Sequence, residues 1–151
     1  MSELANKALR IAIQQLGAEE VPRGSNWGDK VQMYLNSVGI NFPASWCMAF
    51  LYWCFRQAGM AGQLPKTGGC LAMWNTVADK FKSKVPQVGA IVVFDHGKGL
   101  GHVGIIERID GIILHTIEGN TNDEGVREGF EVCRRERKTT DKTIKGYVLP
   151  E

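Results

Sequence analysis

The residue with the clearest chemical potential is Cys47. It follows Pro43-Ala44-Ser45, a sequence typical of a helix start with Ser45 as N-cap, so we expect its thiol in the first turn of a helix. The partial positive charge of a helix N-terminus lowers the pKa of a thiol from about 8.5 and favours the nucleophilic thiolate. A cysteine on an apolar helix is more often a core residue, so a nucleophile here requires a partner base.

His102 is the best placed of the three histidines to be that base. It lies in Gly101-His102-Val103-Gly104, where glycines on both sides leave room at the mouth of a strand. Glu118 and Asn120 follow on the next predicted strand, and either can accept a hydrogen bond from one imidazole nitrogen. A thiol, an imidazole and a group that orients the imidazole are the parts of a catalytic triad for acyl transfer.

The elements that must position these residues fall into two halves of the chain. Apolar residues at helical spacing predict helices in the first half, and short β-branched runs predict strands after Pro86. The segment Trp46–Phe55 is apolar all round, which is typical of a buried central helix. Helices followed by strands indicate an α+β fold with an antiparallel sheet. The other predicted helices cover about 2–17, 25–39 and 69–81, and the predicted strands cover 90–94, 103–109, 112–117, 130–135 and 144–149.

The turn between the two central strands decides whether His102 and Glu118 share a face of the sheet. Asp110-Gly111 is the strongest hairpin signal in the chain. If these two residues form the turn, His102 faces Gly119 and the Glu118 side chain points to the opposite face. A three-residue loop, Ile109–Gly111, ending on a left-handed glycine would place His102 directly opposite Glu118. We therefore predict this loop or an equivalent bulge.

Length, composition and charge restrict the class of protein. The chain has 151 residues, of which 44% are hydrophobic and 23% charged, as expected for one globular domain over residues 1–151. No apolar run approaches the ~18 residues of a membrane span, and no secretory signal is visible. A formal charge of +2 is too small to indicate a nucleic-acid partner. The cysteine spacings contain no C-x2-C knuckle and so argue against a structural zinc, and the single carboxylate of stretch 23–29 is too few for a calcium loop.

Four segments in this order resemble the signature of the CHAP-domain cysteine amidohydrolases and peptidases, relatives of the NlpC/P60 group with a papain-like fold. The similarity extends from about Asn26 to Leu149 and implies that residues 1–151 form a single CHAP-like catalytic domain. The segments are Trp46-Cys47-Met48-Ala49-Phe50, Gly89-Ala90-Ile91-Val92-Val93-Phe94, Gly101-His102-Val103-Gly104-Ile105 and Ile117-Glu118-Gly119-Asn120.

The resemblance implies a role for each site residue. Cys47 would be the nucleophile, His102 the general base and Glu118 the residue that orients it, with Asn120 in support. By the same analogy the amide of Asn41 would donate to the oxyanion. We also expect Trp46 to line the substrate groove, with packing in the core as the alternative. No metal or cofactor is expected.

The resemblance also implies a substrate and a place of action. The expected activity is hydrolysis of amide bonds in bacterial peptidoglycan through a thioester, at the muramoyl–L-alanine link or within the stem or cross-bridge peptide. We expect a monomer, made in the cytoplasm without a visible signal peptide, that acts on the cell wall in the periplasm or outside the cell. A phage lysin released by a holin and an effector delivered by a secretion machinery, with an immunity protein as its partner, both fit.

Two other classes of function remain open at this point. The first is a papain-like protease, deamidase or acyltransferase acting on a protein, because a triad specifies acyl chemistry while the groove specifies the substrate. The second is a catalytically inactive cell-wall-binding module that keeps the fold and has lost turnover.

Overall fold

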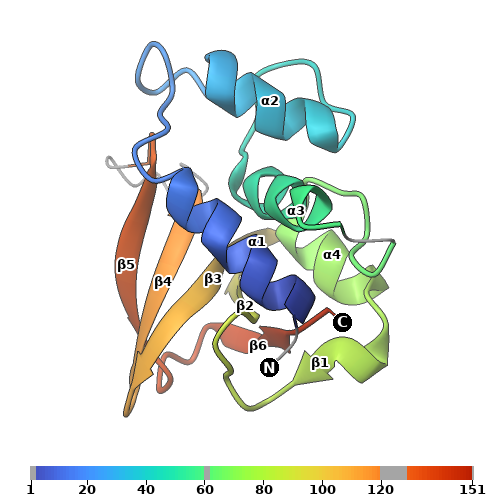
Figure 1. Cartoon of the computed structure of the whole chain (residues 1–151), viewed down its shortest axis with the longest axis vertical. Helices are drawn as coiled ribbons and strands as arrows, with labels where there is room; N and C mark the ends of the chain where they lie inside the picture. The colour runs from blue at the N-terminus through green and yellow to red at the C-terminus, as the bar shows by residue number, and fades with distance from the viewer. Residues whose placement is uncertain (1–2, 60–61, 120–128, 151) are drawn as a thin grey trace.

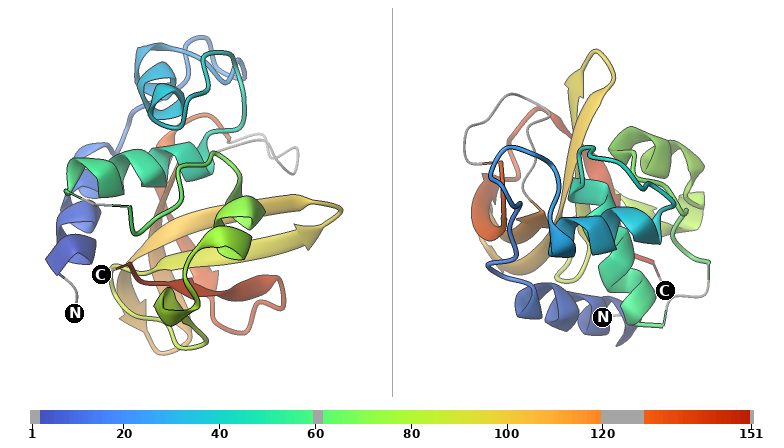
Figure 2. Two further views of the ribbon diagram at one scale, coloured as in Figure 1. Left: turned by 90° about the vertical axis from the view of Figure 1, so that its right-hand side faces the viewer. Right: turned by 90° about the horizontal axis from the view of Figure 1, so that it is seen from above.

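The computed structural model describes residues 3–59, 62–119 and 129–150, in which helices pack against a curved antiparallel sheet (Figures 1 and 2). The strand order in the sheet is β1-β6-β2-β3-β4-β5. The predicted α+β class is therefore confirmed. The elements are α1 (Glu3–Gln14), α2 (Asp29–Ser37), α3 (Cys47–Gln57), α4 (Cys70–Thr76), the 3-10 turn η1 (Asp79–Phe81), β1 (Lys82–Ser83), β2 (Ile91–Gly97), β3 (Leu100–Asp110), β4 (Ile113–Gly119), β5 (Val132–Lys138) and β6 (Ile144–Val148).

Helix α3 is the centre of the packing, as its composition predicts. It contacts α1 and α2 on one side and β3 and β4 on the other. The side chains of Phe50, Leu51 and Phe55 have no exposed surface. Close approach to the sheet depends on Gly119, because a Cβ there would lie 2.9 Å from the Cβ of Phe50. The buried helix thus fixes its first residue, Cys47, against the sheet.

The sheet has two different faces, and the candidate site residues that it carries lie on the face away from the main core. Val103, Ile105 and Ile117 belong to the core cluster that contains α3. By strand alternation their neighbours point to the other face, where Phe94, Ile106 and Leu114 are members of a second apolar cluster. His102 and Glu118 lie on this second face.

The hairpin between β3 and β4 differs from the prediction in register but has the same consequence. Asp110 pairs with Ile113, so the turn is Gly111–Ile112 and the predicted three-residue loop is wrong. A bulge between Ile106 and Arg108 then shifts the register by one residue. This bulge is equivalent in effect to the predicted loop, because it returns His102 and Glu118 to one face.

Several helix boundaries also differ from the prediction. The first helix ends at Gln14 rather than near 17, and the second covers Asp29–Ser37 rather than 25–39. The fourth helix ends at Thr76 rather than Phe81, since the chain is extended at Val77 and continues into β1, which pairs with β6. At the start of α3 the N-cap is Trp46 rather than Ser45, with no side-chain capping bond. Cys47 nevertheless keeps its place in the first turn.

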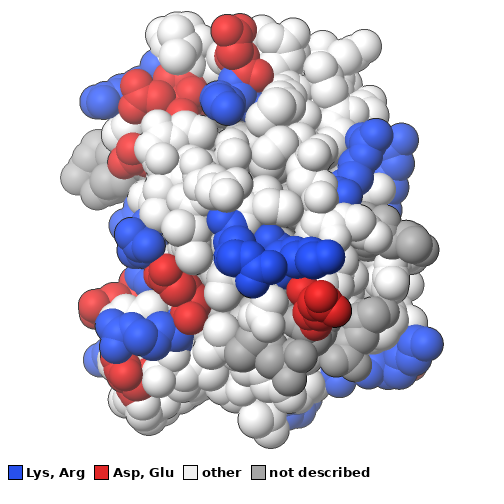
Figure 3. Space-filling view, viewed as in Figure 1, with Lys and Arg blue, Asp and Glu red and all other residues white. Residues whose placement is uncertain are grey.

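The surface carries both signs of charge. On the face shown in Figure 3, acidic and basic side chains are interspersed, and the exposed basic residues of α1, Lys7 and Arg10, lie on the same helix as the exposed Glu3. Within the described ranges no helix is long and apolar enough to cross a membrane.

Candidate active site

The structure brings Cys47 and His102 together where the N-terminus of α3 meets the beginning of β3. Cys47 is the first residue of α3 and is 1% exposed. Its thiol is in hydrogen-bonding contact with the His102 side chain, which is 6% exposed. The two groups whose proximity a thiol–imidazole mechanism requires are therefore neighbours, although they come from different halves of the sequence.

His102 is held on its other side by Glu118. The distance from His102 Nε2 to Glu118 Oε1 is 2.7 Å, so an ionised carboxylate fixes the proton on Nε2 and leaves Nδ1 for the thiol. The register places Glu118 opposite Gly104 rather than opposite His102, as a diagonal neighbour. A Cβ at Gly104 would lie 2.7 Å from the Cγ of Glu118. Gly104 therefore provides the space through which the carboxylate reaches the imidazole.

Two further partners of Glu118 were not expected from the sequence. Arg137 donates from Nε to Oε2 at 2.8 Å and from Nη2 to Oε1 at 2.5 Å, and Thr116 donates from its hydroxyl to Oε2 at 2.7 Å. The Arg137 guanidinium also lies 5.0 Å from the centre of the Phe94 ring. Glu118 is 1% exposed, so its charge is stabilised by these bonds rather than by water.

The charges and hydrogen bonds around His102 and Glu118 favour an ion pair between these two residues. Burial raises the pKa of Glu118, but hydrogen bonds and charges from Arg137 and His102 outweigh burial and hold it well below its usual range. Burial lowers the pKa of His102, but the charges of Cys47 and Glu118 and its hydrogen bonds to both outweigh that effect and raise it to about 10. Glu118 is therefore a carboxylate throughout the neutral range, and His102 retains a proton readily.

The neighbours of the Cys47 thiol shift its pKa in opposite directions. The hydrogen bond to Cys70 and burial raise the pKa of Cys47 above its ordinary value, while the charge of His102 and its hydrogen bond lower it. The sulfur atoms of Cys47 and Cys70 are 3.3 Å apart. This contact was not expected from the sequence, because nothing in the spacing of the cysteines relates the starts of two separate helices.

A hollow of about 330 Å³ opens onto the two thiols. One wall belongs to the turn between β2 and β3, which projects beyond the helices in Figure 2. The hollow gives a small reactant or an extended chain access to Cys47. Its lining residues from the helical half include Ser45, Gly68, Gly69 and Leu71.

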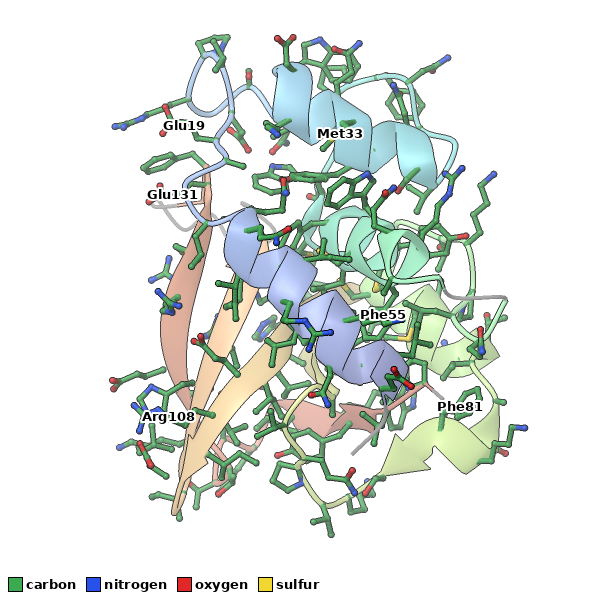
Figure 4. All side chains as sticks on the ribbon, in the orientation of Figure 1. Glu19, Met33, Phe55, Phe81, Arg108 and Glu131 are labelled. Atoms are coloured by element: carbon green, nitrogen blue, oxygen red, sulfur yellow. The ribbon has the colours of Figure 1, made fainter. Side chains whose placement is uncertain are left out.

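The expectation that Trp46 lines the groove is wrong. Its side chain has no exposed surface, its indole N–H donates to Glu20 Oε2 at 2.8 Å, and its ring stacks on Tyr34 with centroids 5.9 Å apart. The loop that carries Glu20 is tied to the chain before β5 by the bridge between Glu19 and Glu131, which lie side by side in Figure 4. Trp46 therefore anchors the start of α3 in the core.

The two candidate amides occupy different positions. Asn41 is exposed in the loop before α3 and does not belong to the lining of the hollow. Asn120 lies outside the described residues. The remaining cysteines are Cys54, which is fully buried in α3, and Cys133, which is half-buried on β5. Among the residues that the structure describes, no group of three His, Cys, Asp or Glu side chains could hold a metal ion.

Comparison with known proteins identifies the family of this fold and site. The profile of the CHAP domain matches residues 38–120, more than half of the chain, and the chain belongs to the CHAP-domain family. This match includes Cys47, His102 and Glu118. No curated protein sequence matches.

Among solved structures, the chain is similar to "The crystal structure of Ly7917", with a TM-score of 0.59 and 20% identity. It is also similar to "The crystal structure of Ly7917 with the hydrolyzing product of MDP", with a TM-score of 0.54 and 19% identity. In both cases the alignment covers 97% of this chain and 62% of the other, so this chain spans less than two thirds of Ly7917. At this level of identity the likeness establishes the shared fold.

Proposed function

We propose that this chain is a cysteine-dependent peptidoglycan hydrolase that cleaves amide bonds, either at the muramoyl–L-alanine link or within the stem or cross-bridge peptide. The observation that carries the proposal is the contact of Cys47 with an imidazole whose other nitrogen is 2.7 Å from a buried carboxylate. Membership of the CHAP family supports a cell-wall substrate, as does the similarity to Ly7917 in its crystal structure with the hydrolysis product of MDP.

The first half of the reaction forms a thioester. With the Cys47 proton held on His102 Nδ1, the Cys47 thiolate attacks the amide carbonyl carbon, and negative charge develops on the carbonyl oxygen. The imidazolium then donates this proton to the leaving nitrogen, the C–N bond breaks, and the amine departs. In the second half His102 removes a proton from water as the water oxygen attacks the thioester carbon. The C–S bond then breaks and the acid product leaves, which restores the Cys47 thiolate and the protonated His102.

Glu118 and Arg137 act through His102 rather than on the substrate. Glu118 fixes the proton on Nε2 and stabilises the imidazolium, because its charge lies against the ring in a buried setting. Arg137 is a positioning residue, since its two parallel donors set the plane of the Glu118 carboxylate.

The negative charge that develops on the carbonyl oxygen needs fixed donors. The backbone N–H of Cys47, in the first turn of α3, is our proposed donor, because the N–H groups of that turn have no acceptor within the helix. The amide of Asn41 is a second proposed donor, and Asn120 is proposed to support the histidine. Substitution of Ser45, which borders the hollow beside Cys47, is the matched control for substitution of Asn41 in a test of this second donor.

The proposed substrate lies in the cell wall, which sets where the enzyme works. It acts as a monomeric domain on peptidoglycan in the periplasm or outside the cell. A holin that releases it, or a secretion machinery that delivers it together with an immunity protein in the producing cell, is the class of partner that this location requires.

The test is digestion of purified peptidoglycan followed by mass spectrometry of the fragments. The wild-type chain releases new amines and carboxylates in equal amounts, and Cys47→Ala and Cys47→Ser release none while melting close to the wild-type temperature. Cys133→Ser is the matched control, because Cys133 lies on β5 away from the hollow, and it digests the wall as the wild type does.

Three results would contradict the proposal in different ways. Full activity of Cys47→Ala would remove the nucleophile. Cleavage of denatured protein but not of peptidoglycan would favour the protein-directed alternative. Binding to cell walls without cleavage of either substrate would favour an inactive module.

A further inference from the structure

Two thiols, not one, lie at the centre of the candidate site. Cys47 begins α3 and Cys70 begins α4, and their sulfur atoms are 3.3 Å apart. Cys47 is 1% and Cys70 is 7% exposed, and both border the same hollow. The mechanism proposed above uses the Cys47 sulfur and the His102 imidazole, and it gives the second thiol no task.

The second thiol is held in place by close packing around α4. A Cβ at Gly101, the residue before His102, would lie 3.0 Å from Cγ of Leu71, the residue after Cys70. A Cβ at Gly68, just before the helix, would lie 2.9 Å from Cδ1 of Ile40. These close approaches pack the start of α4 against both the sheet and the chain before α3. The packing around α4 therefore holds the two sulfur atoms in contact.

The separation of the sulfurs suits a bond between them. A disulfide has an S–S length of about 2.0 Å, so the pair must close by about 1.3 Å, which lies within the reach of small side-chain rotations at two cysteines. The other cysteines do not offer this geometry. Cys54 lies about 10 Å along α3 from Cys47, and Cys133 is on β5.

We propose that Cys70 is the partner thiol in a reversible oxidative modification of Cys47, in which a peroxide converts the pair into a disulfide and switches the site off. In the first step the Cys47 thiolate attacks one oxygen of hydrogen peroxide, the O–O bond breaks, and a sulfenic acid and hydroxide form. In the second step the Cys70 sulfur attacks the sulfenic sulfur, the S–O bond breaks, and water leaves. Two thiols and one peroxide give one disulfide and two waters.

The arrangement has two chemical consequences. The disulfide occupies the sulfur that attacks the substrate, so the oxidised site cannot form a thioester. It also protects that sulfur, because a sulfenic acid without a neighbouring thiol is oxidised further to the irreversible sulfinic and sulfonic acids. A dithiol reductant then restores both thiols by exchange. The first step is faster at mildly alkaline pH, since the pKa of Cys47 is raised.

The loss of activity rests on the proposed function, but the formation of the bond does not. The first measurement is therefore made on the protein itself. The reduced full chain is treated with a small excess of hydrogen peroxide, remaining thiols are alkylated, and peptides are mapped without reduction. We expect a linked pair of peptides containing Cys47 and Cys70, a loss of two hydrogens in the intact mass, and disappearance of the link after dithiothreitol.

The second measurement is wall digestion before oxidation, after oxidation and after dithiothreitol. The wild type loses nearly all turnover on oxidation and regains it on reduction. Cys70→Ser and Cys70→Ala lose turnover and do not regain it, with Cys47 recovered as sulfinic or sulfonic acid. Cys133→Ser, the matched control, behaves as the wild type does. Each variant is compared with its own rate before oxidation.

Each outcome decides the proposal. A peptide map in which Cys47 becomes sulfinic acid in the wild type, or is linked to any cysteine other than Cys70, overturns it. Equal recovery of wild type and Cys70→Ser after reduction also overturns it. A Cys47–Cys70 link in a protein that never digests peptidoglycan supports the thiol pair and rejects the proposed substrate instead.

Discussion

The two sides of the His102 ring differ in how completely their groups are bonded. On the sheet side both oxygens of Glu118 accept hydrogen bonds, from His102, Thr116 and Arg137 at 2.5–2.8 Å. On the helix side the imidazole meets Cys47, whose sulfur lies 3.3 Å from Cys70, and sulfur is a weak donor and acceptor.

This difference separates two tasks within one site. The sheet side consists of groups whose charges are fixed over the neutral range, so it sets the orientation and the charge of the ring. The helix side consists of groups that change during the reaction, through loss of a proton, formation of a thioester or formation of a disulfide. Substitution of a sheet-side residue should therefore lower the rate and shift its pH dependence. Substitution of Cys47 should abolish the reaction, and substitution of Cys70 should mainly change the response to an oxidant.

The largest effect is expected at the ring that joins the two sides. His102→Ala removes the general base and acid, and we expect kcat/KM on peptidoglycan to fall by about 10²–10⁴-fold. The variant should still melt cooperatively, because the buried Glu118 carboxylate keeps its hydrogen bonds to Arg137 and Thr116 when the ring is lost. Retention of most of the activity would mean that the thiol does not depend on this imidazole.

Glu118→Gln is expected to have a smaller effect, because an amide oxygen still accepts a bond from His102 Nε2. The Glu118 charge helps to raise the pKa of His102, so the alkaline limb of the pH–rate profile should move to lower pH in this variant. An unchanged alkaline limb would show that the carboxylate does not set the protonation of the ring.

The same substitution should alter stability in a pH-dependent way. The pKa of Glu118 is lower in the folded chain than the usual value of about 4.3, so its ionisation stabilises the fold fully above that value. This contribution is lost as the pH falls toward the folded-state pKa. The stability difference between wild type and Glu118→Gln, measured by urea unfolding, should therefore be largest near neutral pH and shrink in acid.

The helix side was easier to predict from the sequence than the sheet side. An apolar segment after a start signal placed Cys47 in the first turn of a buried helix, and this required only local information. The pairing of His102 with Glu118 required the register, and a one-residue bulge at Glu107 cannot be located from the alternation of residue types. The sequence nevertheless predicted that His102 and Glu118 share a face of the sheet, because this requires only one irregularity somewhere in the hairpin between them.

Contacts made by long side chains, or between residues far apart in the chain, could not be predicted from the sequence pattern. Arg137 lies opposite Leu114 in the register, four residues along β4 from Glu118, and reaches the carboxylate only through the length of its side chain. Trp46, next to Cys47, was expected at the groove, but the buried Glu20 carboxylate binds its indole from a loop 26 residues earlier. Each of these contacts depends on tertiary packing.

A further prediction concerns Arg137. Arg137→Gln removes charge-assisted bonds to Glu118, each of which contributes about 1.5–3 kcal/mol, so we expect kcat to fall by about tenfold or more with little change in KM. Arg137→Lys should recover part of the loss. Arg134→Gln is the matched control, because Arg134 lies on the same strand and pairs instead with Glu107. Equal effects at the two arginines would assign Arg137 a merely structural role.

The smallest effect is expected at Cys70 in the absence of oxidant. The hydrogen bond to Cys70 is the largest cause that raises the pKa of Cys47, so Cys70→Ala should lower that pKa. The acid limb of the pH–rate profile should consequently move to lower pH. The alkaline limb, which depends on His102 and Glu118, should move less. A shift of the acid limb to higher pH would mean that Cys70 donates its proton to the Cys47 thiolate, because a donor stabilises the charged form and its removal raises the pKa.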